Sequence, residues 1–87
     1  MKPLFWLALV LAACGGRVGQ SAECATYVSC VRATDAPEQR TTNLERFLAD
    51  GACWVHADTG ELCETGCRRG LEWMRAHLAA LPRECAP

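Results

Sequence analysis

The residues of this chain best suited to chemistry are two cysteines four positions apart, Cys63 and Cys67. On a helix this spacing places both thiols on one side, where they suit a soft metal such as Cu(I) or a redox-active dithiol. Two histidines, His56 and His77, are available as further ligands. Both cysteines also fall on the predicted core stripe of a helix, however. We therefore favour structural disulfides over a metal or redox site.

The cysteine count supports the same interpretation. The chain of 87 residues has seven cysteines, and six of them follow Cys14: Cys24, Cys30, Cys53, Cys63, Cys67 and Cys85. An even number of cysteines in a short exported chain indicates a disulfide framework. A domain of this length buries only a thin core and usually needs such covalent help.

The first residues have the organisation of an export signal. Lys2 supplies a positive charge, an apolar run follows from Leu4 to Ala13, and small residues close it. This order is typical of a secretory signal peptide. We therefore divide the chain into a signal peptide (1–13), a flexible glycine-rich tether (14–20) and a helical domain (21–87).

The residues that close the apolar run, Leu11-Ala12-Ala13-Cys14, resemble the lipobox of bacterial lipoproteins. The resemblance implies recognition of the first three residues and cleavage between Ala13 and Cys14. It also implies a diacylglyceryl group on the Cys14 thiol and an acylated amino terminus, which together would anchor the chain firmly to a membrane. In bacterial lipoproteins an aspartate directly after the lipidated cysteine commonly signals retention at the inner membrane. Here Gly15 occupies that position, which resembles the signal for the outer membrane.

The charge of the rest of the chain does not support nucleic-acid binding. After residue 13 there are eight arginines, no lysine and ten acidic residues, a net side-chain charge of −2, and no basic face stands out. We interpret the pair Arg68-Arg69 as solvated surface, because three glutamates lie on the same predicted helix. No Ser-His-Asp order, glycine-rich phosphate loop or pair of catalytic carboxylates can be argued. We predict a non-catalytic protein without a cofactor.

Hydrophobic periodicity predicts an all-α fold of about three helices. The first helix, at about 22–34, begins after Ser21, a suitable N-cap residue. Its two cysteines, Cys24 and Cys30, are six positions apart, which turns them by about 120° around the helix. We expect each of them to face a different partner.

A second, short helix is predicted at about 43–50. Thr42 and Glu45 match a capping box at its start, and Gly51 suits the residue after its end. The corner that follows holds Cys53 and Trp54, where we expect an indole to cover a disulfide.

The longest helix is predicted at about 59–81. Asp58 and Glu61 form a capping-box pair at its start, and Pro82 stops it. Its apolar residues recur at steps of four and three and form a sustained core stripe: Cys63, Cys67, Leu71, Met74, Leu78 and Leu81.

Six cysteines allow fifteen pairings. If the three helices run up, down and up, the tail comes close to the end of the first helix, which favours a bridge between Cys30 and Cys85. The other four then pair among themselves, Cys24 and Cys53 each with one of Cys63 and Cys67. An alternative stays open, with the pairs Cys24–Cys67, Cys30–Cys63 and Cys53–Cys85.

The spacing of these residues has a resemblance of its own. The pattern is Cys24-x-x-Tyr27-x-x-Cys30, Gly51-x-Cys53-Trp54, Cys63-x-x-x-Cys67 and a late Cys85. It resembles a group of small cysteine-rich lipoproteins from myxobacteria. The resemblance implies a location and a scaffold, and it implies no activity.

We therefore predict a lipid-anchored envelope protein that serves as a structural or binding module. Its membrane attachment is the covalent lipid on Cys14, at the outer membrane, and its candidate partner is another envelope protein. The rival hypothesis is a periplasmic copper- or thiol-redox-handling protein that uses Cys63 and Cys67.

Overall fold

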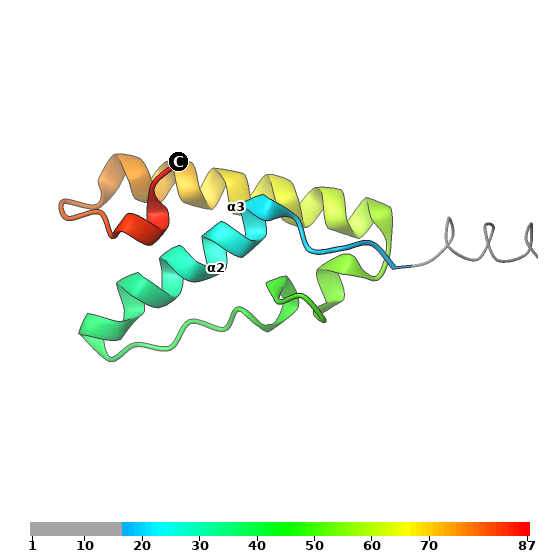
Figure 1. Ribbon diagram of the computed structural model, residues 1–87, viewed down its shortest axis with the longest axis horizontal. Helices are drawn as coiled ribbons and strands as arrows, with labels where there is room; N and C mark the ends of the chain where they lie inside the picture. Colours follow the sequence, from blue (N-terminus) through cyan, green and yellow to red (C-terminus); the bar gives the residue numbers. More distant parts are fainter. Residues whose placement is uncertain (1–16) are drawn as a thin grey trace, which may run out of the picture.

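Two α-helices lie side by side and run in the same direction. The computed structural model describes residues 17–87 of the chain. Helix α2 spans Ala22–Asp35 and helix α3 spans Ala57–His77, and both begin toward the same end of the molecule (Figure 1). Four 3₁₀ turns complete the elements of the described residues: η1 (Ala36–Glu38), η2 (Glu45–Phe47), η3 (Ala52–Trp54) and η4 (Arg83–Cys85). The predicted all-α class is confirmed.

Helix α2 forms where the sequence predicts it. The Ser21 hydroxyl accepts a hydrogen bond from the Cys24 N–H at 3.1 Å, and Glu23 lies in the first turn. Both features stabilise the positive end of the helix dipole. The α-helix ends at Asp35 and passes directly into the 3₁₀ turn η1, in which Ala36 keeps a helical conformation (φ −56°, ψ −50°). Pro37, in the first turn of η1, has no N–H with which to continue the α-helical hydrogen bonds.

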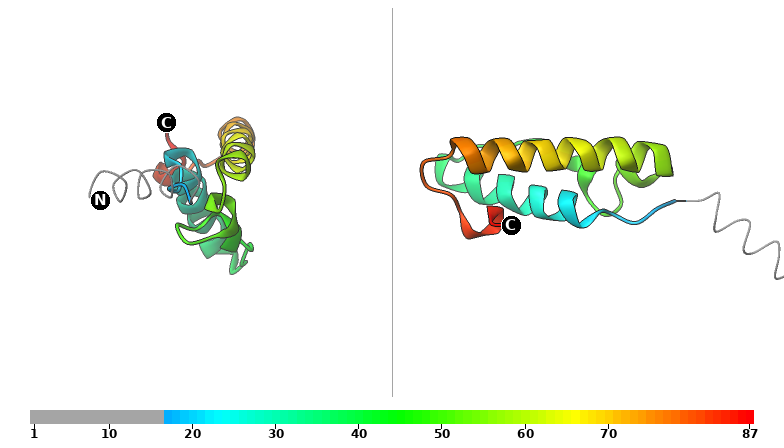
Figure 2. Two further views of the ribbon diagram at one scale, coloured as in Figure 1. Left: turned by 90° about the vertical axis from the view of Figure 1, so that its right-hand side faces the viewer. Right: turned by 90° about the horizontal axis from the view of Figure 1, so that it is seen from above.

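The chain then returns along the two helices, as the middle limb of an up, down and up arrangement (Figures 1 and 2). The α-helix predicted at 43–50 is instead the single 3₁₀ turn η2 followed by extended backbone at Leu48. The Phe47 carbonyl accepts hydrogen bonds from the Gln20 amide at 2.8 Å and from the Trp54 indole at 3.3 Å. A segment this short cannot sustain an α-helix by itself, and its carbonyl groups are taken by tertiary partners.

The capping residues of the middle limb also differ from the prediction. The Asn43 side chain, not Thr42, accepts a hydrogen bond from the Glu45 N–H, at 3.1 Å. Gly51 has φ −78°, so it is not a left-handed C′ residue. Its missing side chain has another role, because a Cβ there would overlap the backbone of Arg46.

Helix α3 begins two residues earlier than predicted and ends at His77, four residues before the predicted end. Its N-cap is His56, so the capping-box prediction for Asp58 and Glu61 is wrong. The chain leaves the helix at Leu78 because the tail must turn back, where Cys85 bonds Cys30 in α2. Leu81 of the predicted core stripe therefore lies outside the helix and is 40% exposed.

The core consists largely of cystine. Five of the ten buried apolar residues of the described chain are half-cystines: Cys24, Cys30, Cys53, Cys67 and Cys85. Trp54, 1% exposed, packs against three of them, as the prediction of a covered bridge expects. Tyr27 touches all three small clusters of buried residues and joins them into one interior. Because the core and the three bridges lie within residues 17–87, this part has what it needs to fold by itself.

Residues 17–20, here called the strap, lie against the domain. The Val18 N–H donates to the Trp54 carbonyl at 2.8 Å, and the Val18 side chain packs on the cluster around Trp54. Arg17 donates from Nη2 to the carbonyl groups of Ala49 and Gly51, at 3.3 and 3.1 Å. The structure thus corrects the prediction of a flexible tether for residues 17–20, and residues 14–16 lie outside the described part. Composition indicated flexibility, but free carbonyl groups at the corner hold these residues.

Two glycines of α3 allow close packing and a third does not. A Cβ at Gly70 would lie 2.6 Å from the Tyr27 ring, and one at Gly60 would lie 3.1 Å from Val18. A Cβ at Gly66 would have nothing within 4 Å. Gly70 therefore sets the distance between α3 and α2, while Gly66 has no packing role within residues 17–87.

These two positions form a matched pair for a stability measurement. We expect Gly70→Ala to lower the free energy of unfolding by about 1–3 kcal/mol, because the added methyl group overlaps a ring fixed in the core. We expect Gly66→Ala to raise it by up to about 1 kcal/mol, since alanine favours the helix and meets open space. Thermal unfolding followed by circular dichroism on residues 15–87 measures both. Equal effects of the two substitutions would contradict the packing described here.

Candidate functional site

The six cysteines form three disulfides that tie together every main element. They are Cys24–Cys67, Cys30–Cys85 and Cys53–Cys63, with Cα–Cα distances of 5.1, 4.6 and 5.9 Å. These pairs agree with the favoured pairing and differ from the alternative in two of the three bridges. Cys24 and Cys30 do face different partners, as their spacing on α2 predicts.

Cys63 and Cys67, the strongest chemical candidates in the sequence, belong to two separate bridges. Cys67 is fully buried, and the sulfur of its partner Cys24 lies 3.4 Å from the Cys63 carbonyl oxygen. Neither sulfur is a thiolate in this state, and a thiolate is what both metal binding and thiol exchange require. The Cys67 bridge cross-links α3 to α2, and the Cys63 bridge ties α3 to the corner at Cys53.

The two histidines are far apart in the fold. His56 is the N-cap of α3, and His77 is the last residue of the same helix. Both are exposed. Within residues 17–87, no group of three or more His, Cys, Asp or Glu side chains is arranged to hold a metal ion.

The disulfides also define the compartment of the protein. Three bridges indicate an oxidising, extracytoplasmic environment. No helix in the described residues is long and apolar enough to cross a membrane. The predicted lipidation and cleavage residues, Cys14 and Ala13, lie outside the described residues.

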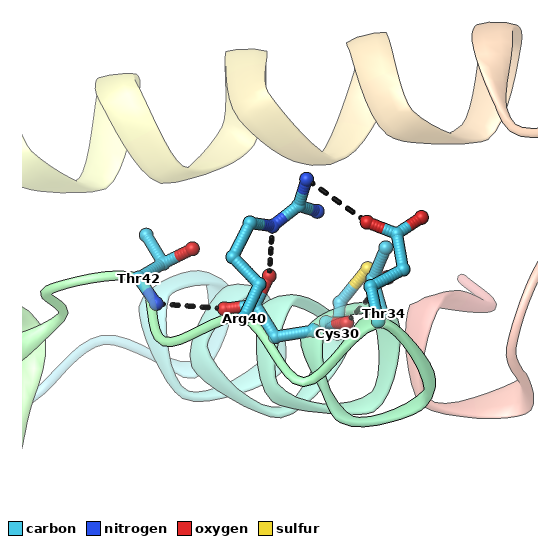
Figure 3. A network of polar contacts seen from close by, with 6 residues as sticks. Cys30, Thr34, Arg40 and Thr42 are labelled. Carbon is cyan, nitrogen blue, oxygen red and sulfur yellow. Dashed lines mark hydrogen bonds and ion pairs between the residues drawn. The ribbon is translucent and has the colours of Figure 1, made fainter.

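A polar network holds the turn at the far end of α2 (Figure 3). The Asp35 carboxylate accepts from the Arg40 Nε–H at 3.0 Å and from the Thr42 N–H at 2.8 Å. Arg40 also pairs with Glu38, at 3.0 Å. Asp35 is the one buried charged residue among those described, at 6% exposure. A buried charge needs hydrogen-bonding partners, and Arg40 and Thr42 supply them.

These contacts shift the proton equilibria of the pair. The pKa of Asp35 lies below its usual 3.8, chiefly because Thr42 hydrogen bonds to the carboxylate. Partial burial opposes this effect, and the hydrogen bond and charge of Arg40 add to it. The pKa of Arg40 is raised by the hydrogen bond to Asp35 and by the charge of Glu38. Both shifts show that the folded state favours the charged forms.

Two surface depressions adjoin at this network. The larger one, about 570 Å³, lies between the end of α2 and the middle limb, with Arg32 and Leu48 on its walls. The smaller one, about 280 Å³, lies between α2 and α3 and is lined by Tyr27, Val31 and Trp73 among others. Asp35, Arg40 and Thr42 line both depressions. The Asp35–Arg40 pair thus separates two shallow depressions whose walls are partly apolar.

Trp73 is the largest exposed apolar side chain near these depressions, at 58% exposure. Its ring stacks on His77 at a centroid distance of 4.5 Å, and His77 Nδ1 lies 2.8 Å from the Trp73 carbonyl oxygen. The histidine therefore holds the indole in one orientation on the surface. The sequence places the two side chains on one side of the helix, and their spacing of four residues is the signal for their contact.

Asp35 and Arg40 were not among the residues predicted to form a site. Five residues separate them in the sequence, across a break at Pro37, so no helical spacing links them. The available signal was Asp35 itself, an acidic residue at the end of a helix, where the dipole disfavours negative charge. A charge in that position needs a partner, and here the turn after the helix supplies it.

Comparisons with models of known protein families, with curated proteins and with solved structures find no match to this chain.

The network predicts a dependence of stability on pH. Because the pKa of Asp35 is lowered in the folded state, its contribution is complete above its unfolded value near 3.8 and is lost as the pH falls through the lower folded value. We expect Asp35→Asn to lower the urea midpoint at pH 7 and to have a smaller effect at pH values below the unfolded pKa. Glu38→Gln, a matched change on an exposed carboxylate, should have little effect. A midpoint difference between Asp35→Asn and the unaltered chain that is constant across this range would contradict the assignment.

Proposed function

We propose that this chain is a lipid-anchored protein of the bacterial envelope that serves as a rigid, non-catalytic structural or binding module. The observation that carries the proposal is the use of all six cysteines after Cys14 in three bridges. Bridges account for every cysteine except the one at the end of the lipobox-like motif. Lipid on Cys14 would leave the mature protein without a free thiol.

The strap supports an attachment close to the membrane. Only Gly15 and Gly16 separate Cys14 from Arg17, which donates to two carbonyl groups of the domain. Three residues span at most roughly 11 Å even when fully extended. The corner around residues 49–54 would therefore lie next to the bilayer. Asp35 is the last residue of α2 and Trp73 is near the end of α3, so both would lie toward the other end of the helices.

The outer membrane is the membrane we propose. Gly15 after the lipidated cysteine resembles the address of outer-membrane lipoproteins, and the cysteine pattern resembles small lipoproteins of myxobacteria. These resemblances support a location and a scaffold. The contact partner would be another envelope protein, reached through the surface depressions and the indole of Trp73.

The rival function, copper or thiol-redox handling by Cys63 and Cys67, has less support. Each of these residues is bonded to a cysteine of another element, Cys53 or Cys24. A working dithiol would have to break two bridges at the centre of the core before it bound a metal. We therefore keep this function as the alternative that a thiol measurement would reveal.

Lipidation is tested by mass spectrometry of the amino-terminal peptide. We expect the unaltered protein to begin at Cys14, to carry the mass of the attached lipid and to enter the detergent phase on phase separation. Cys14→Ser should abolish both the added mass and this partition, because no thiol remains to accept the lipid. Gly15→Ala, a matched change beside it, should keep both properties. An unmodified Cys14 in the unaltered protein, or cleavage at another bond, would contradict the proposal.

A further inference from the structure

The order of the six cysteines along the domain differs from the order in which they are bonded. Cys53 and Cys63 are the only bonded pair of consecutive cysteines among them, with a separation of 10 residues. The other two bridges span 43 and 55 residues, and the loop closed by each contains one cysteine of the other. Both therefore require Cys24 and Cys30 to remain apart until the last part of the chain is present.

The first bridge that an oxidant would close is a different one. Cys24 and Cys30 are six positions apart, and they precede the other four cysteines in the order of synthesis. Because loop closure becomes less probable with the three-halves power of loop length, Cys24 meets Cys30 roughly 20-fold more readily than it meets Cys67, 43 residues away. Pairing of each cysteine with the next would give three bridges, of which two are wrong: Cys24–Cys30, Cys53–Cys63 and Cys67–Cys85.

A bridge between Cys24 and Cys30 cannot coexist with helix α2. Both residues lie in this helix, and six residues rise by about 9 Å along a helix axis. A disulfide needs its two Cα atoms within about 7 Å of each other. The mispaired chain therefore cannot form α2, nor the native core in which Trp54 packs on Cys24 and Cys67. The wrong bonds have to be broken before this core can form.

The oxidised chain has no thiol of its own with which to break a wrong bond. Exchange begins with the attack of a thiolate on a disulfide sulfur, and all six cysteines of the domain are already bonded in the mispaired chain. The need for an outside thiolate rests on the proposed function, because Cys14 without lipid could itself attack.

We propose that this chain is a substrate of a thiol–disulfide isomerase of the envelope, which exchanges two consecutive bridges for the two native ones. The isomerase thiolate bonds to the Cys30 sulfur, and the electron pair of the broken bond leaves on Cys24. Cys24 then attacks Cys67 and releases the Cys85 thiolate. Cys85 attacks Cys30, forms the last native bridge and frees the isomerase thiolate. Two bridges are exchanged for two, so nothing is oxidised or reduced overall.

The mispaired chain also presents a surface that such an isomerase can recognise. Val28 and Val31 are 5% and 6% exposed in the native protein, where they pack in one cluster with Leu44. Without helix α2 this cluster is open, and exposed apolar side chains are typical of incompletely folded chains. An isomerase with an apolar surface beside its thiolate would bind the mispaired chain. The native chain, with the cluster closed, would no longer bind.

Export of the full chain in two bacterial hosts tests the proposal. Both hosts retain their envelope thiol oxidase, and one lacks its envelope disulfide isomerases. Thiols are alkylated at harvest, and the bridged peptides are mapped by mass spectrometry. We expect the fraction of chains with native bridges to fall at least about fivefold without isomerase, with Cys24–Cys30 and Cys67–Cys85 in their place. An equal native fraction in both hosts, or wrong bridges that do not include Cys24–Cys30, would overturn the proposal.

Residues 15–87, exported behind an ordinary cleaved signal peptide, separate this inference from the proposed lipidation. This form lacks Cys14, so we expect it to depend on the isomerase whether or not the full chain is lipidated. Dependence of residues 15–87 alone would contradict lipidation, since an unmodified Cys14 would then replace the isomerase in the full chain. Independence of both forms would overturn the exchange and leave lipidation to be decided by the mass of the amino-terminal peptide.

Two double variants and a trapped complex test the sequence of steps. Cys53→Ala with Cys63→Ala removes the bridge that takes no part and should keep the dependence on the isomerase. Cys24→Ala with Cys67→Ala removes the near partner of Cys30 and should reduce it. An isomerase variant without its second active-site cysteine should be recovered bonded to the chain, even where mispaired chains are degraded. Absence of this complex, or loss of the dependence in the first variant, would overturn the proposal.

Discussion

The bridge between Cys24 and Cys67 is the constraint on which the other contacts depend. It joins the first turn of α2 to the middle of α3 and holds the two helices parallel, while Trp54 packs over it. Parallel neighbours cannot be joined by a short turn, so a long middle limb has to run back along the pair. The other two bridges tie the corner at Cys53 and the tail at Cys85 to the same pair of helices. Half of the buried apolar residues in the described part of the chain are half-cystines. The same side chains therefore both cross-link the chain and fill its core.

The two ends of this framework differ in chemistry. At the corner, backbone carbonyl groups accept from the strap, which is continuous with the segment that would carry the anchor. At the far end of α2, the buried carboxylate of Asp35 is neutralised by Arg40 and held by Thr42. One end is therefore held by backbone hydrogen bonds and the other by a buried charge with its polar partners. Both helices run from the first end toward the second (Figure 1).

Much of the helical fold could be predicted from the sequence, because its signals are local. Ser21 marks the start of α2, and the stripe through Cys67 and Leu71 marks the buried face of α3. The middle limb could not be predicted, since Phe47 gives its carbonyl group to Gln20 and Trp54, which are distant in the sequence. The early end of α3 follows from a tail bridge, and the docked strap from carbonyl groups at a corner. In each case a tertiary contact overrode a local preference. For the candidate site, the bonded cysteines were predictable and the Asp35 network was not.

The most direct test of this account is disulfide mapping of protein purified from cells without reductant. Free thiols are alkylated first, and the bridged peptides are then identified by mass spectrometry after non-reducing digestion. The account predicts no free thiol among the six cysteines of the domain, and it predicts the three bridges Cys24–Cys67, Cys30–Cys85 and Cys53–Cys63. Alkylated Cys63 and Cys67, or a bridge between Cys30 and Cys63, would contradict it.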